Sequence, residues 1–171
     1  MTALYPILTE LEKWREPRLA LHDGVPTLFR LSCTLIDEPA SPVEILRASG
    51  DRGLSEFWGH HREAELFKDD EFGQWGLHIL TPNAALRMTT EERSRRPRDY
   101  RDGDLVLGRF YGDSELLILE GARERSESRV RVAMPTDERD DWPTVAVSFQ
   151  DFLEKFVLSQ GQKYWEVRGL Q

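Results

Sequence analysis

The stretch DLVLGRFYGDSELLILE, Asp104–Glu120, decides the fold class. Two apolar runs in it are separated by a Gly-Asp pair, a combination typical of two antiparallel strands joined by a tight turn. The pattern continues in SRVRVAM, which begins at Ser128, and in the short run TVAV, which begins at Thr144. We therefore predict a β-meander that occupies this part of the chain.

A helix is expected directly after the meander. The Ser148 side chain can cap its first turn, and Asp151 follows three positions later. One wide apolar stripe then recurs at helical spacing. It consists of Phe149, Phe152, Leu153, Phe156 and Val157. A helix of this kind must pack its stripe on the sheet.

The region before the meander mixes helices and strands. Ser41-Pro42-Val43-Glu44 combines a capping hydroxyl, a proline at the first helical position and a carboxylate three residues past the cap, so it predicts a helix start. A short helix around Leu54 should end near Gly59, and another should begin at Thr81-Pro82. Between them, AELF and GLHIL are short apolar runs typical of half-buried strands.

Helical spacing also characterises the first 40 residues. Apolar residues recur at Leu4, Leu8, Leu11 and Trp14, and again after Pro26 at Leu28, Leu31, Leu35 and Ile36. Residues 1–40 are thus expected to form a helical N-terminal extension, whose place in the domain stays open. The whole pattern predicts one domain over residues 1–171, of class α+β, with a single twisted, mainly antiparallel sheet packed by helices.

Composition restricts the classes of partner. The 171 residues carry a net charge of -8, which repels nucleic acid and anionic lipid and attracts basic proteins. No long apolar run and no cationic leader is seen, so we expect a cytoplasmic protein with no membrane contact. Cys33 is the single cysteine, which excludes an internal disulfide.

The sequence gives little support for a catalytic, metal or cofactor site. The grouping His60, His61, Glu63, Glu65 and His78 has suitable ligand types, but its spacing fits no metal signature. Cys33 lacks a local nucleophile signature, and no glycine-rich phosphate loop is present. The arginines within Glu91–Asp104 are balanced by acidic residues, which argues against a nucleic-acid stripe. We expect no catalytic residue, no metal and no cofactor.

Two acidic loops, each followed by a tryptophan, are the candidate partner-binding residues. Negative charge steers a basic partner, and tryptophan is enriched in binding hot spots. The alternative is that both tryptophans belong to the core beside solvated turns. The candidates are Asp69, Asp70, Glu71 and Trp75 in the first loop, and Asp137, Glu138, Asp140, Asp141 and Trp142 in the second.

Two segments together resemble the SUKH superfamily, which joins bacterial immunity proteins to fungal Smi/Knr-type cell-wall regulators. The first is GLSEFWGHHREAELFKDDEFGQWGLHILTP, Gly53–Pro82, which resembles the family's helix, small turn and two short strands. The second is DLVLGRFYGDSELLILE with the later VRVAMP and VAVSFQDFLEKFV, which resembles its C-terminal strands and closing helix. The resemblance covers Ser41 to Leu158, and the first 40 residues have no counterpart in it.

The resemblance implies a compact α+β domain without catalytic residues. Bacterial members typically bind and neutralise a toxin domain, often a nuclease, so it implies an immunity protein whose partner is a basic toxin domain. The alternative is an intracellular regulatory or scaffold module of the same fold that binds a cellular protein or a small ligand. Both interpretations are non-enzymatic, and neither fixes the oligomeric state.

Overall fold

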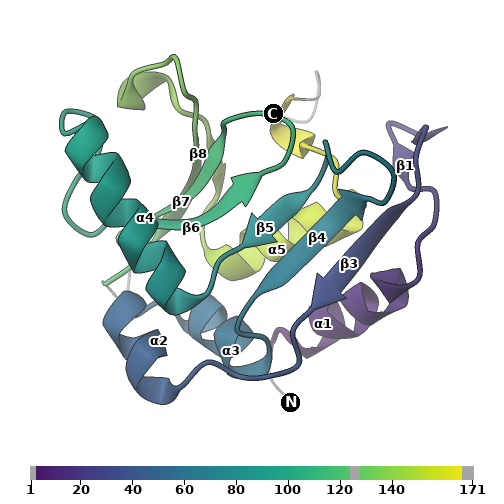
Figure 1. The fold of residues 1–171 in the computed structure, drawn as a ribbon, viewed down its shortest axis with the longest axis horizontal. Helices are drawn as coiled ribbons and strands as arrows, with labels where there is room; N and C mark the ends of the chain where they lie inside the picture. Colours follow the sequence, from purple (N-terminus) through teal and green to yellow (C-terminus); the bar gives the residue numbers. More distant parts are fainter. Residues whose placement is uncertain (1–2, 124–127, 167–171) are drawn as a thin grey trace.

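The computed structural model describes residues 3–123 and 128–166, which form five α-helices, three short 3-10 helices and nine strands (Figure 1). In chain order these are α1 (Tyr5–Glu12), η1 (Lys13–Arg15), β1 (Leu21–His22), β2 (Val25–Pro26), β3 (Leu31–Leu35), α2 (Pro42–Ala48), α3 (Arg52–His60), β4 (Ala64–Asp69), β5 (Leu77–Ile79), α4 (Pro82–Arg95), β6 (Leu105–Phe110), β7 (Leu116–Glu120), β8 (Arg129–Ala133), η2 (Arg139–Asp141), β9 (Thr144–Ala146), α5 (Phe149–Leu158) and η3 (Tyr164–Glu166).

Seven of the strands form one antiparallel sheet in the order β3-β4-β5-β6-β7-β8-β9, so each strand pairs with its neighbour in sequence. β1 and β2 form a separate small hairpin. The predicted α+β class, the mainly antiparallel sheet and the meander are confirmed. Because successive strands alternate in direction, the β4–β5, β6–β7 and β8–β9 connections all lie at the same end of the sheet.

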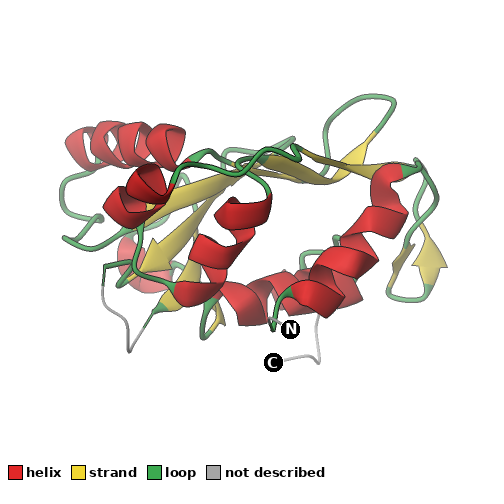
Figure 2. Cartoon of the chain, turned by 90° about the horizontal axis from the view of Figure 1, so that it is seen from below, coloured by secondary structure: helices red, strands yellow, loops and turns green. Residues whose placement is uncertain are grey.

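The two faces of the sheet are covered unequally (Figure 2). Helices α1, α3 and α5 pack on one face and enclose the main core, in which Trp58, Phe152 and Phe156 are fully buried. Helix α4 lies on the other face, over β6 and its neighbours, where Val106 and Trp142 belong to a smaller apolar cluster. Within the described residues, no helix combines the length and the apolar composition needed to cross a lipid bilayer.

Three helix starts follow the capping signals in the sequence. Ser41 and Glu44 make the reciprocal bonds of a capping box at α2. The Thr81 hydroxyl accepts the Ala84 N–H at α4, and the Ser148 hydroxyl accepts the Asp151 N–H at α5. These local bonds satisfy backbone donors that the first turn of a helix leaves free.

The expectation for residues 1–40 is half right. Tyr5–Glu12 is helical, but Leu31–Leu35 is an edge strand and Leu21–Pro26 is a hairpin. The region is not an extension either, because α1 buries apolar residues in the main core and β3 completes the sheet. Residues 1–2 of the expected extension lie outside the described residues.

Candidate protein-binding surface

The β4–β5 turn is built around one carboxylate. Asp69 is buried, and its two oxygens accept four backbone N–H bonds of 2.6–2.9 Å, from Phe72, Gly73, Gln74 and Trp75. Burial alone would raise the pKa of Asp69, but the four donors outweigh it and hold the pKa below its usual value. Asp69 therefore fixes the shape of the turn, and its burial corrects the expectation that its carboxylate faces a partner.

The exposed aromatic of this turn is Phe72. Its side chain is 61% exposed and packs edge-on against Phe29, with ring centroids 5.1 Å apart. Asp70 and Glu71 are exposed beside it. Trp75, the aromatic expected at the surface, is instead half-buried against the core and donates its indole N–H to the Gly161 carbonyl at 3.0 Å.

The second acidic loop, between β8 and β9, exposes carboxylates without an aromatic. Glu138, Asp140 and Asp141 are exposed, and Asp137 is half-buried. Trp142 is only 2% exposed and packs against Tyr100, with its indole N–H bonded to the Asp137 carbonyl. Trp142 is therefore a core residue and is not available as a surface anchor, which corrects the expectation for this loop.

The two acidic loops do not form one surface. Both lie at the same end of the sheet, but the β6–β7 connection stands between them, and Figure 1 places them at opposite corners of that end. The corner that carries the β4–β5 turn has a further feature that the other lacks.

That feature is the β1–β2 hairpin, which the sequence analysis missed. Asp23 and Gly24 form its turn with positive φ values of 53° and 74°, the conformation that Asp-Gly adopts in a two-residue hairpin. The hairpin is attached to the rest of the protein at its base. The Leu21 N–H bonds the Gln160 side chain at 2.8 Å, and the His22 ring lies 5.6 Å from the Trp75 ring.

Large apolar side chains are concentrated on this hairpin and on the adjoining turn. Five of the ten exposed large apolar residues among the described ones lie here, whereas single exposed apolar residues scattered over a surface are ordinary. Leu28 is the most exposed, at 91%. Leu21 pairs with Pro26 and Val25 with His22, so the Leu21 and Val25 side chains point to opposite faces of the hairpin. We call the exposed apolar residues beside the β4–β5 turn the corner patch; it consists of Leu19, Leu28 and Phe72.

Charged side chains border the corner patch. Leu19, Leu28 and Phe29 share a hollow of about 420 Å³ with Asp70, Glu71 and Arg30. Backbone bonds tie the two segments, since the Asp70 N–H donates to the Arg30 carbonyl at 3.1 Å. An apolar centre with a polar rim is the usual composition of a protein–protein interface.

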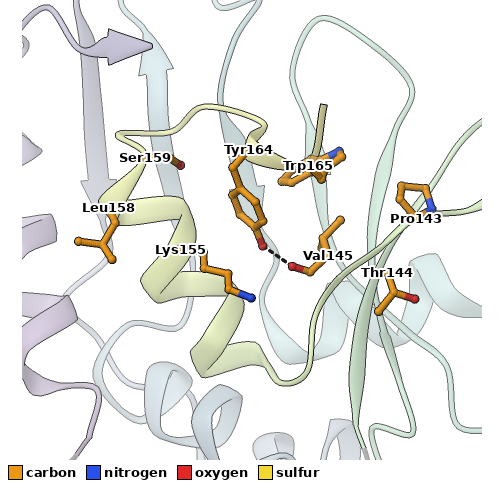
Figure 3. Close-up of a pocket in the computed structure, with 8 residues that line it drawn as sticks. All are labelled: Pro143, Thr144, Val145, Lys155, Leu158, Ser159, Tyr164 and Trp165. Atoms are coloured by element: carbon orange, nitrogen blue, oxygen red, sulfur yellow. Dashed lines mark hydrogen bonds between the residues drawn. The ribbon is translucent and has the colours of Figure 1, made fainter. Parts of the chain in front are cut away.

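A second hollow, of about 730 Å³, lies between β9 and α5 (Figure 3). The Tyr164 hydroxyl donates to the Val145 carbonyl at 2.6 Å and covers part of the free edge of β9. Lys155, the one charged residue among the described lining residues, is bonded to Asp151 at 3.0 Å, and Leu158 points away from Tyr164. The described lining therefore brings no acid and base together.

The histidines and carboxylates considered as metal ligands lie in two separate places, at the end of α3 and on the outer face of the sheet. His60 is exposed at the end of α3, and His61 is buried beside it. On the outer face of the sheet, His78 bonds Glu63 at 2.6 Å, while Glu65 bonds Lys68 and the Tyr111 hydroxyl. These side chains form pairwise contacts instead of a single ligand set.

One group among the described residues does have metal-ligand types in proximity, namely Glu12, Asp37 and His61. Arg15 already lies among them, bonded to Glu12 at 2.5 Å and to Asp37 at 2.6 Å. Burial lowers the pKa of His61. A cation would have to displace the guanidinium that neutralises both carboxylates, so the donor set fits an arginine better than a metal ion.

Three of the five arginines of Glu91–Asp104, namely Arg93, Arg95 and Arg96, are bonded within the protein. Arg96 bonds Asp99 at 2.9 Å and the Met134 carbonyl at 3.0 Å, and Arg95 bonds Glu92 at 2.8 Å. The Arg96 bond to Met134 links the end of α4 to the residue after β8, whereas the Arg95 bond lies within α4.

Cys33 is expected to be unreactive in the folded protein. Burial raises the pKa of its thiol to about 12, more than the Phe67 N–H bond to its sulfur lowers it. The thiolate fraction near pH 8 should be on the order of a thousandfold below that of a free thiol. Iodoacetamide should label Cys33 of the folded protein at that reduced rate, and Cys33 of the urea-unfolded protein at the rate of a free thiol. Mass spectrometry over time measures both rates. Labelling of the folded protein at the free-thiol rate would contradict the burial.

No family model matches the chain, and no curated protein and no solved structure matches it significantly.

Proposed function

We propose that the protein is a non-catalytic binding domain, of the immunity type, that binds and neutralises a basic toxin domain of nuclease type. The observation that carries the proposal is the corner patch, an exposed apolar group beside the acidic side chains of a rigid turn. The resemblance to the SUKH superfamily suggests the immunity class, and the net charge of -8 suggests a partner with a positive net charge.

The physical roles divide between charge and apolar contact. A nuclease domain tends to be basic because it must approach phosphate, so a negatively charged partner accelerates its encounter. Apolar side chains that lose water at the centre of the contact slow dissociation. In this protein Leu28 and Phe72 would supply the centre, and Asp70 and Glu71 would supply part of the acidic rim.

The experiment is purification of the tagged protein from its native cells at low and then high salt, with identification of what is bound. Recovery of a basic toxin domain in near-equal amount, and inhibition of that domain by the purified protein, would support the proposal. Recovery of a housekeeping protein would favour a regulatory module instead. Recovery of no partner at either salt concentration would count against a binding function.

Two substitutions test the surface once a toxin domain is in hand. Leu28→Ser and Phe72→Ala should each raise the dissociation rate about tenfold or more, because each removes an exposed apolar contact without removing a core residue. Leu158→Ser is the matched control, since Leu158 is also an exposed leucine, with an exposed fraction of 76%, but lies on α5. Surface plasmon resonance separates the rates. Equal dissociation rates for Leu28→Ser, Phe72→Ala and the control would show that the interface does not include the corner patch.

A further inference from the structure

A third surface lies at the other end of the sheet, between α2 and α3. It is a groove of about 1030 Å³. Most of the residues that line it are apolar residues or glycines. Leu46 on α2 also lines it and is 76% exposed. Figure 1 shows these helices far from the β1–β2 hairpin, so the groove is separate from the corner patch.

Glycine 59 leaves the groove open. Gly59 lies near the end of α3, where glycine costs about 1 kcal/mol relative to alanine. A Cβ added there would meet no atom within 4 Å. Gly53, in the same helix, differs, because its Cβ would lie 3.2 Å from Gln150. Packing within the fold thus explains the glycine at Gly53 and does not explain the one at Gly59.

The described lining of the groove is opposite in charge to the protein. Among the described residues that line it, two are exposed arginines, Arg47 and Arg123, and none is acidic, although the chain as a whole carries a net charge of -8. Glu44 on the same helix is turned away into bonds with Asn83 and with the Ser41 backbone N–H. The groove therefore complements an anionic ligand that also carries an apolar group.

We propose that the groove between α2 and α3 binds an acidic peptide segment of a partner protein. An apolar side chain of that segment occupies the space over Gly59 beside Leu46, and its carboxylates face Arg47 and Arg123. This interaction is independent of the corner patch, because it uses different elements and the opposite sign of charge. A protein with both surfaces can hold a basic domain at one end and an acidic segment at the other.

The test uses a short synthetic peptide of alternating leucine and glutamate as the probe, with a lysine-for-glutamate peptide as its counterpart. Fluorescence anisotropy should show saturable binding of the glutamate peptide, about tenfold or more tighter than that of the lysine peptide. Gly59→Leu should weaken binding about tenfold by filling the space, while its better helix propensity keeps the protein folded. Arg47→Glu should weaken it similarly.

Arg87→Glu is the matched control, because Arg87 is exposed on α4 outside the groove and its replacement changes the net charge equally. It should bind the glutamate peptide as the wild type does. The proposal is overturned if the wild type shows no saturable binding, or if Gly59→Leu, with an unfolding temperature at least equal to that of the wild type, binds the peptide unchanged.

Discussion

Replacing Arg139 with methionine is expected to lower the free energy of unfolding by about 3–5 kcal/mol. Arg139 and Asp104 form an ion pair in which both side chains are almost completely buried, with bonds of 2.5 and 3.0 Å. The Arg139 guanidinium also donates to the Asp99 carbonyl at 2.8 Å. Methionine fills a similar space but leaves the Asp104 carboxylate buried without its counter-ion, which is the costly step.

The double variant Arg139→Met with Asp104→Leu is the control for this prediction. Removing both charges also removes the unpaired carboxylate, so much of the lost stability should return. Urea denaturation followed by tryptophan fluorescence measures both variants, since Trp142 lies beside the pair. A loss below about 1 kcal/mol in the single variant would mean that water reaches Asp104 and that the pair is not buried in solution.

Local signals in the sequence predicted most of the sheet and of the helix starts. A helix cap acts through bonds to residues three positions away. The helix starts at Ser41, Thr81 and Ser148 could therefore be predicted from a few neighbouring residues. The meander is equally local, because each strand from β3 to β9 pairs with its neighbour in sequence.

The first 40 residues were misread because the spacing of their apolar residues is ambiguous. Leu31 and Leu35 are four residues apart, a separation that places side chains on one face of a helix and also on one face of a strand. Cys33 between them is buried as well, which is the alternation of a strand. The Asp23-Gly24 turn was a local signal for the hairpin and was overlooked.

The candidate site depended on contacts that the sequence does not contain. Trp142 follows an acidic loop as Trp75 does, but a cluster with Tyr100 and Met88 on the outer face of the sheet buries it. Whether an aromatic beside a charged turn points inward is decided by such distant partners. The exposed position of Phe72 likewise follows from the bonds that Asp69 makes to the turn.

Replacing Asp69 with asparagine is expected to cost about 2–4 kcal/mol of unfolding free energy at neutral pH. Asparagine can still accept bonds from Phe72 and Gly73 with its one oxygen. Its amide group would then face the N–H groups of Gln74 and Trp75, which are donors themselves. Asp70→Asn is the control, because Asp70 is exposed in the same turn and its change should stay within about 0.5 kcal/mol.

The same substitution has a distinct pH dependence. Because the pKa of Asp69 is lowered in the folded protein, its contribution is complete above the unfolded value, near pH 4, and is lost as pH falls through the folded value. The wild type should therefore lose stability below about pH 4 more steeply than Asp69→Asn does. Parallel curves, measured by urea denaturation at several pH values, would contradict the role given to the four N–H bonds.

Under the proposed function, the turn also links stability to binding, and this separates Asp69→Asn from an ordinary destabilising change. Asp69 fixes the backbone that presents Phe72, Asp70 and Glu71, yet its own side chain is buried. At a temperature where the variant is fully folded, Asp69→Asn should weaken binding at the corner patch, whereas Arg139→Met, which is expected to be at least as destabilising but lies in the β8–β9 connection, should not. Equal toxin affinity of both folded variants would show that the patch does not need the rigid turn.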